Sequence, residues 1–176
     1  MTATAHPNRQ SLWSDIKDCK FAMFTTRHPN GHLHSRPMTM QNTALEADDS
    51  LWFFMSRKSD PVADLATEPS VNVAYSPQGD ACWISVTGTA RVVEDGDKAK
   101  SLWSRAADAW FSGGPTDPDL ALVEVHIVHA SKWETGAEVG SRPALRSGDV
   151  GVRPPIHLPT ATTPASENAA LMFERS

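Results

Sequence analysis

Residues 28–41 read His-Pro-Asn-Gly-His-Leu-His-Ser-Arg-Pro-Met-Thr-Met-Gln, and this stretch carries a clear turn signal. Its Asn-Gly pair is among the strongest short-range signals for a two-stranded turn. Strand-like runs lie on both sides of the pair: residues 20–27, rich in Phe and Thr, and residues 32–41, whose side chains alternate in character. The stretch therefore predicts a β-hairpin, and Pro37 is expected at a sheet edge, a bulge or a ligand contact because it cannot donate to a strand ladder.

The rest of the body predicts more strands than helices. The strands are joined mostly by short turns and no βαβ unit repeats, so a small antiparallel barrel is favoured over a Rossmann sheet. A proline in the first turn marks the start of the second helix. The expected strands are residues 20–27, 32–41, 51–55, 71–75, 81–93 and 120–133, and the expected helices are 11–18, 59–67 and 95–109.

Length and composition exclude several classes of protein. The 176 residues are 40% hydrophobic, which suffices for one domain with a real core, and the net charge of −5 argues against a nucleic-acid or anionic-membrane binder. No apolar run is long enough to span a bilayer, and no secretory signal pattern is present, so we expect a cytoplasmic protein. We expect one domain over residues 1–139 and a proline-rich C-terminal extension over residues 140–176.

The cysteines and histidines do not form a recognisable metal motif. Cys19 and Cys82 lie far apart, with no zinc-type spacing. His126 and His129 are three apart in an expected strand, which predicts that they point to opposite faces. His32 and His34 share a face without a carboxylate or cysteine near them in the sequence, so no metal site is predicted.

Two neighbouring strands carry groups suited to a phosphorylated aromatic ligand. Arg36 offers a guanidinium, and residues 56–59 offer hydroxyls that run into the start of a helix; these groups bind phosphate. The apolar strand at residues 51–55 offers backbone donors to a flat heteroaromatic ring. The alternative is that Arg36 pairs with one of the many acidic side chains. The six tryptophans suit a core, a dimer interface or a planar ligand equally well.

Taken in order, these stretches resemble the FMN-binding split-barrel superfamily that includes pyridoxamine 5′-phosphate oxidase, and more closely its general stress protein branch. The resemblance covers about residues 10–135. The stretches that carry it are Gly31-His-Leu-His-Ser-Arg-Pro-Met, Leu51-Trp-Phe-Phe-Met-Ser, Pro69-Ser-Val-Asn-Val-Ala-Tyr, Trp83-Ile-Ser-Val-Thr-Gly-Thr-Ala-Arg-Val-Val-Glu-Asp, Trp110-Phe-Ser-Gly-Gly-Pro-Thr-Asp-Pro-Asp-Leu and Ala130-Ser-Lys-Trp-Glu.

The resemblance implies a mainly β protein: a six-stranded antiparallel split barrel of Greek-key type with a few flanking helices, which forms a homodimer and binds FMN at the subunit interface. It assigns the phosphate to Arg36 and Ser59, and it implies that Trp110 of the other subunit covers the ring. The residues implied to line or touch the isoalloxazine are Pro37, Met38, Thr39, Phe53, Phe54, Met55 and Ser56.

Two departures from the family pattern bear on function. A lysine that usually binds the phosphate is replaced by Pro61, so the charge is expected to come from Arg57 or Lys58, and whether FMN is retained stays open. The Arg-x-His signature of the true oxidases is also missing, which argues against oxidation of pyridoxamine phosphate.

The leading hypothesis is an FMN-dependent oxidoreductase of unknown substrate, supplied with electrons by a nicotinamide nucleotide or a small-molecule donor. Two alternatives remain open from the sequence. One is a non-enzymatic stress-response protein that sequesters FMN or senses redox state, and the other is a barrel that has lost its flavin.

Overall fold

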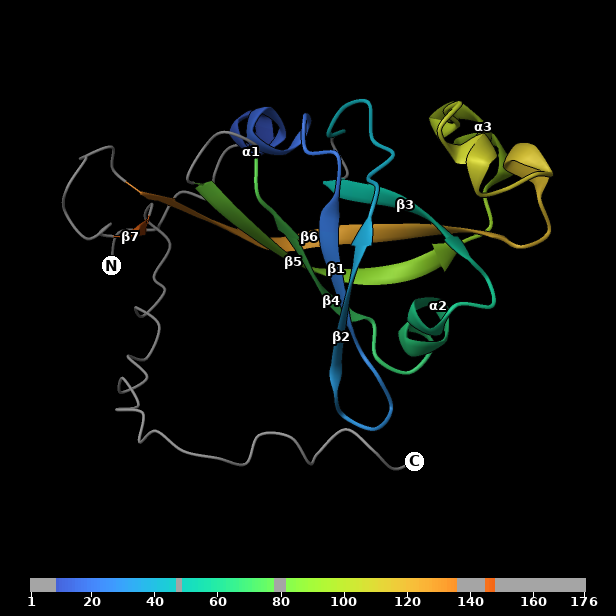
Figure 1. Ribbon diagram of the computed structural model, residues 1–176, viewed down its shortest axis with the longest axis horizontal. Coiled ribbons are helices and arrows are strands. Elements are labelled where there is room, and N and C mark those ends of the chain that lie inside the picture. Colours follow the sequence, from blue (N-terminus) through green and yellow to red (C-terminus); the bar gives the residue numbers. More distant parts are fainter. Residues whose placement is uncertain (1–8, 47–48, 78–81, 136–144, 148–176) are drawn as a thin grey trace, which may run out of the picture.

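A computed structural model describes residues 9–46, 49–77, 82–135 and 145–147, and it is mainly β. Figure 1 shows a curled sheet with short helices at its margins. The antiparallel strands follow the order β2-β1-β4-β5-β6-β3, and β7 pairs with β6. The helices are α1 (Arg9–Ile16), α2 (Asp60–Leu65) and α3 (Gly96–Leu102), and the strands are β1 (Ala22–Arg27), β2 (Leu33–Met38), β3 (Ser50–Ser56), β4 (Ser70–Tyr75), β5 (Cys82–Val93), β6 (Leu120–Thr135) and β7 (Leu145–Ser147). The prediction of a mainly antiparallel β barrel with flanking helices is confirmed.

The hairpin predicted around the Asn-Gly pair is the β1–β2 unit. Its strands pair from Ala22 with Met38 to Arg27 with Leu33, and Gly31 adopts a φ of +88°, which glycine tolerates without steric cost. One face of the hairpin is buried against the barrel, because β1 alternates buried and exposed side chains along its length. The same alternation places Arg36 and Met38 on the inner side of β2.

The core lies inside the curl of the sheet, and the edge strand β3 contributes Leu51, Phe53 and Met55 to it. Every residue of β3 except the last is buried, as expected for an apolar strand covered on both faces. Phe53 packs edge-on against Phe24 of β1 with ring centroids 5.1 Å apart. The other face of β3, with Trp52 and Phe54, packs against α3 and the segment that follows it.

The two edge strands of the sheet meet at one point and separate beyond it. Met40, just after β2, bridges Phe53 of β3. Close by, Gln41 donates its backbone N–H to the carbonyl of Trp52 over 2.8 Å, and the N–H of Trp52 donates to the side-chain oxygen of Asn42 over 2.7 Å. Trp52 therefore turns both backbone groups away from β6. Because this orientation repeats every second residue, Phe54 also turns its N–H and C=O away from β6, toward the side where β2 and β3 are unpaired apart from the Met40 bridge. We call this side the opening between β2 and β3.

Two local predictions were wrong. The helix expected over residues 95–109 ends at Leu102: Trp103 is extended, and a 3-10 turn covers Ala107–Ala109. Trp103 instead packs on Phe54 and donates its indole N–H to Asp108 over 2.9 Å.

The second error concerns His126 and His129, which lie on the same face of β6. The register pairs His129 with Thr87 and His126 with Thr89, with a β-bulge between them. The extra residue of the bulge reverses the alternation that the spacing of three would otherwise give. Across the described residues, no group of three potential metal ligands gathers at these histidines or elsewhere.

Two further findings concern the ends and the membrane. Among the described segments, no helix is long and apolar enough to cross a membrane. β7 lies within the range that we assigned to the C-terminal extension, while residues 148–176 lie outside the described part of the chain.

Candidate functional site

Arg36 on β2 is a half-buried cation that has no acidic partner in the part of the chain that the structure describes. Its Nη1 donates to the hydroxyl of Thr26 on β1 over 3.2 Å. Within the described segments, no carboxylate lies within ion-pair distance of the guanidinium, and its other N–H groups have no protein acceptor. The alternative, in which Arg36 pairs with an acidic side chain, finds no support among the described residues. A guanidinium held in this way can accept a planar or tetrahedral anion.

Asp64 on α2 holds the hydroxyl of Thr26, which in turn accepts the hydrogen bond from Arg36. Its side chain is only 1% exposed, and it accepts hydrogen bonds from Thr26 Oγ1 at 2.6 Å and from His28 Nδ1 at 2.9 Å. Burial alone raises the pKa of Asp64. The bonds from Thr26 and His28, with the charges of His28 and Arg36, outweigh burial and bring that pKa below its ordinary value. Asp64 is thus a buried carboxylate that stays ionised.

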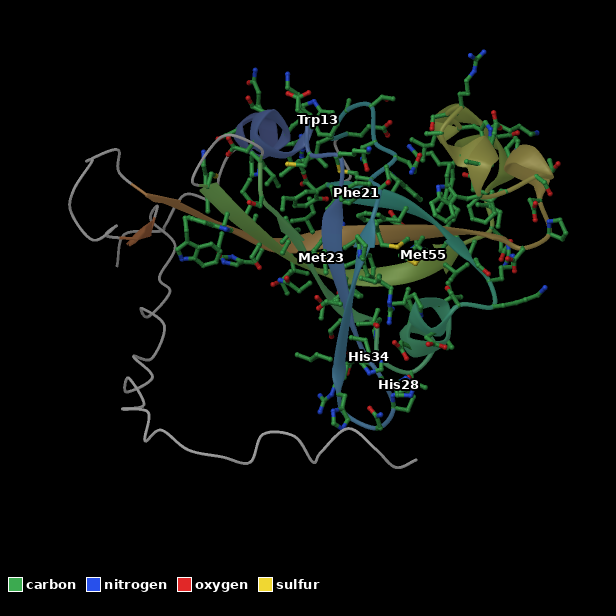
Figure 2. The ribbon with its side chains drawn as sticks, in the orientation of Figure 1. Trp13, Phe21, Met23, His28, His34 and Met55 are labelled. Carbon is green, nitrogen blue, oxygen red and sulfur yellow. The ribbon has the colours of Figure 1, made fainter. Side chains whose placement is uncertain are left out.

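His28 and His34 form a stacked pair beside this carboxylate. Their ring centroids lie 5.1 Å apart and their planes differ by 13°. His28 comes from the hairpin loop and His34 from β2, and Figure 2 shows the two side chains together at the loop end of the hairpin, next to α2. The hairpin and α2 thus gather a guanidinium, two imidazoles and one buried carboxylate in one place.

The residues expected to contact a ring surround the opening between β2 and β3. Pro37 and Thr39 are exposed and Met38 is half-buried, so their surfaces are available to a ligand. Phe53, Phe54 and Met55 are buried as whole residues, with at most 7% of the surface of each exposed. The N–H and C=O of Phe54 point into the opening, as argued above.

Residues 56–59 are organised by their own hydrogen bonds. Ser56 Oγ donates to Asp119 over 2.6 Å and accepts from the backbone N–H of Lys58, while Ser59 Oγ donates to the carbonyl of Ser56. The lone pairs of the Ser59 hydroxyl therefore face away from that bond, and its proton is already committed. Pro61 is buried in the first turn of α2 and carries no charge to the site.

The two basic residues expected to replace the missing lysine, Arg57 and Lys58, differ in their contacts. Arg57 makes a bidentate ion pair with Glu94, with both N···O distances 2.7 Å. It lines a cavity of about 350 Å³ between the end of β5 and the loop before β6. Lys58 is exposed, and its side chain forms no hydrogen bond or ion pair among the described residues. After the backbone N–H groups of Asp119 and Gly113, its charge helps to lower the pKa of Asp117. Lys58 is therefore the cation that remains available to a ligand.

Trp110 stands apart from these residues within its own chain. It follows the 3-10 turn at residues 107–109 and is 84% exposed. Within the described part of the molecule, its ring makes no aromatic contact and its indole N–H has no acceptor. A side chain this large and this exposed is available to a ligand or a second subunit.

Comparison with known proteins gives the site its context. A family model described as pyridoxamine 5′-phosphate oxidase like matches residues 7–143. The chain belongs to the pyridoxamine 5′-phosphate oxidase-like family. The resemblance recognised in the sequence is confirmed.

Individual proteins are similar over about two thirds or more of this chain. Protein bli-3 of Neurospora crassa is 32% identical over 128 residues, 68% of this chain but only 61% of that protein. The structure of a general stress FMN/FAD binding protein from Xanthomonas citri is 28% identical, with a TM-score of 0.64 over 77% of this chain and 94% of that one. A general stress family protein from Xanthomonas campestris pv. campestris, also 28% identical, has a TM-score of 0.65 over 77% and 92% of the two chains.

Sequence reasoning missed three residues of the cluster in this pyridoxamine 5′-phosphate oxidase-like chain: Thr26, His28 and Asp64. Asp64 lies 38 residues from Thr26 and 36 from His28, so no local spacing connects them. The one available signal was an acid on the inner face of a short helix next to a buried strand, where an unpaired carboxylate would be unfavourable.

Proposed function

We propose that this chain binds FMN at the opening between β2 and β3, as a flavin-dependent oxidoreductase of the general stress type. The observation that carries the proposal is the half-buried guanidinium of Arg36, which has no carboxylate partner in the described chain. A buried or half-buried cation is unfavourable unless it is paired, so its environment suits an anionic ligand. The name of the Xanthomonas citri relative, an FMN/FAD binding protein, supports a flavin as that ligand.

The residues at the opening match the parts of FMN. Arg36 supplies charge-assisted hydrogen bonds to the phosphate, and the exposed ammonium of Lys58 supplies a second charge. The backbone N–H and C=O of Phe54 match the polar edge of the isoalloxazine, which carries both acceptors and a donor. Pro37, Met38 and Thr39 provide a surface for the flat ring. FMN is favoured over riboflavin because riboflavin has no phosphate to pair with the positive charges of Arg36 and Lys58.

A second copy of the chain completes the proposed site. The outward side of the sheet exposes apolar side chains that are costly to leave in water, and they come from several strands and from the residue before β1. A symmetric dimer would cover these positions and bring Trp110 of one subunit to the opening of the other. The exposed residues are Phe21, Met23, Leu33, Trp83 and Val128.

The bound flavin would supply the redox chemistry, accepting electrons from a donor such as a nicotinamide nucleotide and passing them to an acceptor. The chain's own residues would bind and orient it: Arg36 and Lys58 at the phosphate, and Phe54 at the ring edge. Because the Arg-x-His signature is missing, the substrate is expected to differ from pyridoxamine phosphate.

The test is the visible spectrum of the purified full chain before and after addition of FMN, with riboflavin as the matched ligand. The proposal expects a bound flavin spectrum, saturation at one FMN per subunit and a dimer by light scattering. Reduction of the bound flavin by NADH or NADPH, followed by reoxidation with an added acceptor, supports the oxidoreductase. Stoichiometric binding without turnover by any donor supports the flavin-sequestering alternative, and no binding of either flavin would overturn the proposal.

A further inference from the structure

The imidazole of His34 is a titratable group that the binding scheme so far leaves unused. It stacks on His28, and among the described residues neither of its ring nitrogens has a hydrogen-bond partner. His28 differs, because its Nδ1 is bonded to the buried carboxylate of Asp64 over 2.9 Å. On the same face of β2, two residues further along, lies Arg36. The two ring nitrogens of His34 have no described hydrogen-bond partner, and they share a strand face with the guanidinium of Arg36. They are therefore suited to contact the ligand that Arg36 binds.

We propose that His34 takes up a proton when a phosphate ester binds beside Arg36, so that the site binds such ligands more tightly as the pH falls from 8 to 6.5. The proposal rests on the proposed function for the identity of the ligand. It adds a pH-dependent contact to that site, carried by the hairpin and not by α2.

The charges around the stacked pair explain why proton uptake would depend on the ligand. Asp64 from α2 offsets one positive charge, and Arg36 on β2 already supplies one, with Thr26 as the neutral link between them. In the absence of an anion, a proton on His34 would add a second positive charge to the face of β2 that already carries Arg36. Like charges on one face of a strand oppose each other. A dianionic phosphate reverses the balance, since each added proton then gains an attractive partner.

Histidine is the side chain whose ordinary charge change falls between pH 5 and 8, with a typical pKa near 6.5. A tenfold gain in the proton affinity of such an imidazole on binding makes the ligand about threefold to fivefold tighter at pH 6.5 than at pH 8, after allowing for the second pKa of the phosphate itself, about 6. A lysine in this role would show no such change, because it stays charged throughout this range.

The experiment titrates FMN and riboflavin into the full-length wild type and two single variants at pH 6.5 and pH 8.0, following flavin fluorescence. His34→Asn removes the imidazole that takes up the proton and keeps a polar side chain of similar size. His32→Asn is the matched control: it lies two residues away on the same hairpin, but it is exposed and outside the stack. Thermal unfolding of each variant verifies the fold. Calorimetry of FMN binding at pH 7.0, in two buffers of different ionisation enthalpy, counts the protons taken up.

The proposal expects wild type and His32→Asn to bind FMN about threefold to fivefold more tightly at pH 6.5, with net proton uptake. It expects His34→Asn to change less than about twofold between the two pH values and to lose most of the proton uptake, while riboflavin is insensitive to pH in all three proteins. If FMN binds but His34→Asn keeps the pH dependence of wild type, or if riboflavin shows the same dependence, the proposal is overturned and the flavin site stands. If neither flavin binds to any protein at either pH, the proposed function fails and the inference fails with it.

Discussion

Asp64 on α2 and Thr26 on β1 are joined by a 2.6 Å hydrogen bond, and the same hydroxyl accepts a bond from Arg36. Thr26 therefore sits between a buried carboxylate and a half-buried guanidinium that do not form an ion pair with each other. The carboxylate stabilises the cation through the hydroxyl without occupying its donors. A direct ion pair in this position would have left Arg36 much less able to bind an external anion.

This arrangement makes stability depend on pH through Asp64. Its pKa in the folded protein lies below the ordinary value of 3.8, because the bonds from Thr26 and His28 and the nearby positive charges outweigh the effect of burial. A depressed pKa means that the stabilisation is fully present above the unfolded pKa and is lost as the pH falls through the folded one. Asp64→Asn is expected to lower the free energy of unfolding by about 1–3 kcal/mol at pH 7.

The measurement is urea unfolding at pH 7 and near pH 3. The difference between wild type and Asp64→Asn should shrink at the lower pH, where the wild-type carboxylate begins to protonate. Asp60→Asn is the control, since Asp60 is exposed on the same helix and should change stability by less than about 0.5 kcal/mol. A difference that is the same at both pH values would mean that the shape of the side chain matters and its charge does not.

Arg36→Ala should separate the phosphate from the ring. Removal of a charge-assisted, half-buried contact is expected to weaken FMN binding by about tenfold or more, and to leave riboflavin within about twofold, because riboflavin lacks the phosphate. Arg27→Ala is the matched control, with an arginine from the adjacent strand β1 whose side chain is exposed. Fluorescence titrations of both ligands measure the effect. Equal losses for FMN and riboflavin would assign Arg36 a structural role.

The neighbouring residues Arg57 and Lys58 are expected to behave differently even though both are exposed bases in one loop. Arg57 is held by both carboxylate oxygens of Glu94, whereas the side chain of Lys58 makes no hydrogen bond or ion pair in the described chain. Lys58→Ala should weaken FMN by about threefold to tenfold, and the loss should shrink in high salt because the contact is solvent-exposed. Arg57→Ala should stay within about twofold. The reverse order of effects, measured at two salt concentrations, would show that the ion pair with Glu94 opens to admit the phosphate.

Local patterns in the sequence sufficed for much of the fold. The Asn-Gly pair predicted the hairpin, the apolar run predicted the buried strand β3, and Pro61 marked the first turn of α2, since each signal acts over a few residues. The proposal that Arg36 and residues 56–59 act on one ligand came from their residue types, and the resemblance to the family assigned their roles, because spacing alone cannot show that two strands approach each other.

Features that depend on tertiary contacts escaped the sequence. The bulge that places His126 and His129 on one face depends on the pairing of β6 with β5, and the early end of α3 depends on the packing of Trp103 against Phe54. The cluster around Asp64 needs α2 to cover β1. Asp64 becomes buried only when α2 packs on β1, and its partner Thr26 lies 38 residues away in the sequence.

Trp110 provides a test of how the site is shared between two subunits. Because its side chain is 84% exposed, Trp110→Ala should change the stability of the fold by less than about 0.5 kcal/mol. Trp103→Ala is the contrasting variant: Trp103 packs against Phe54 and Phe111, and its loss should destabilise the fold by about 2–4 kcal/mol. If Trp110 covers the flavin ring, its removal should weaken FMN and riboflavin alike, by about threefold to tenfold, since stacking does not involve the phosphate.

The decisive measurement mixes the Arg36→Ala and Trp110→Ala proteins, after mild unfolding and refolding so that the subunits exchange. In a dimer whose sites each take Arg36 from one chain and Trp110 from the other, the mixed dimer contains one site with both changes and one intact site. Half of the sites in mixed dimers should then bind FMN with wild-type affinity, although neither variant does so alone. If Trp110 acts within its own chain, every site in the mixture carries one of the two defects, and no tight binding returns.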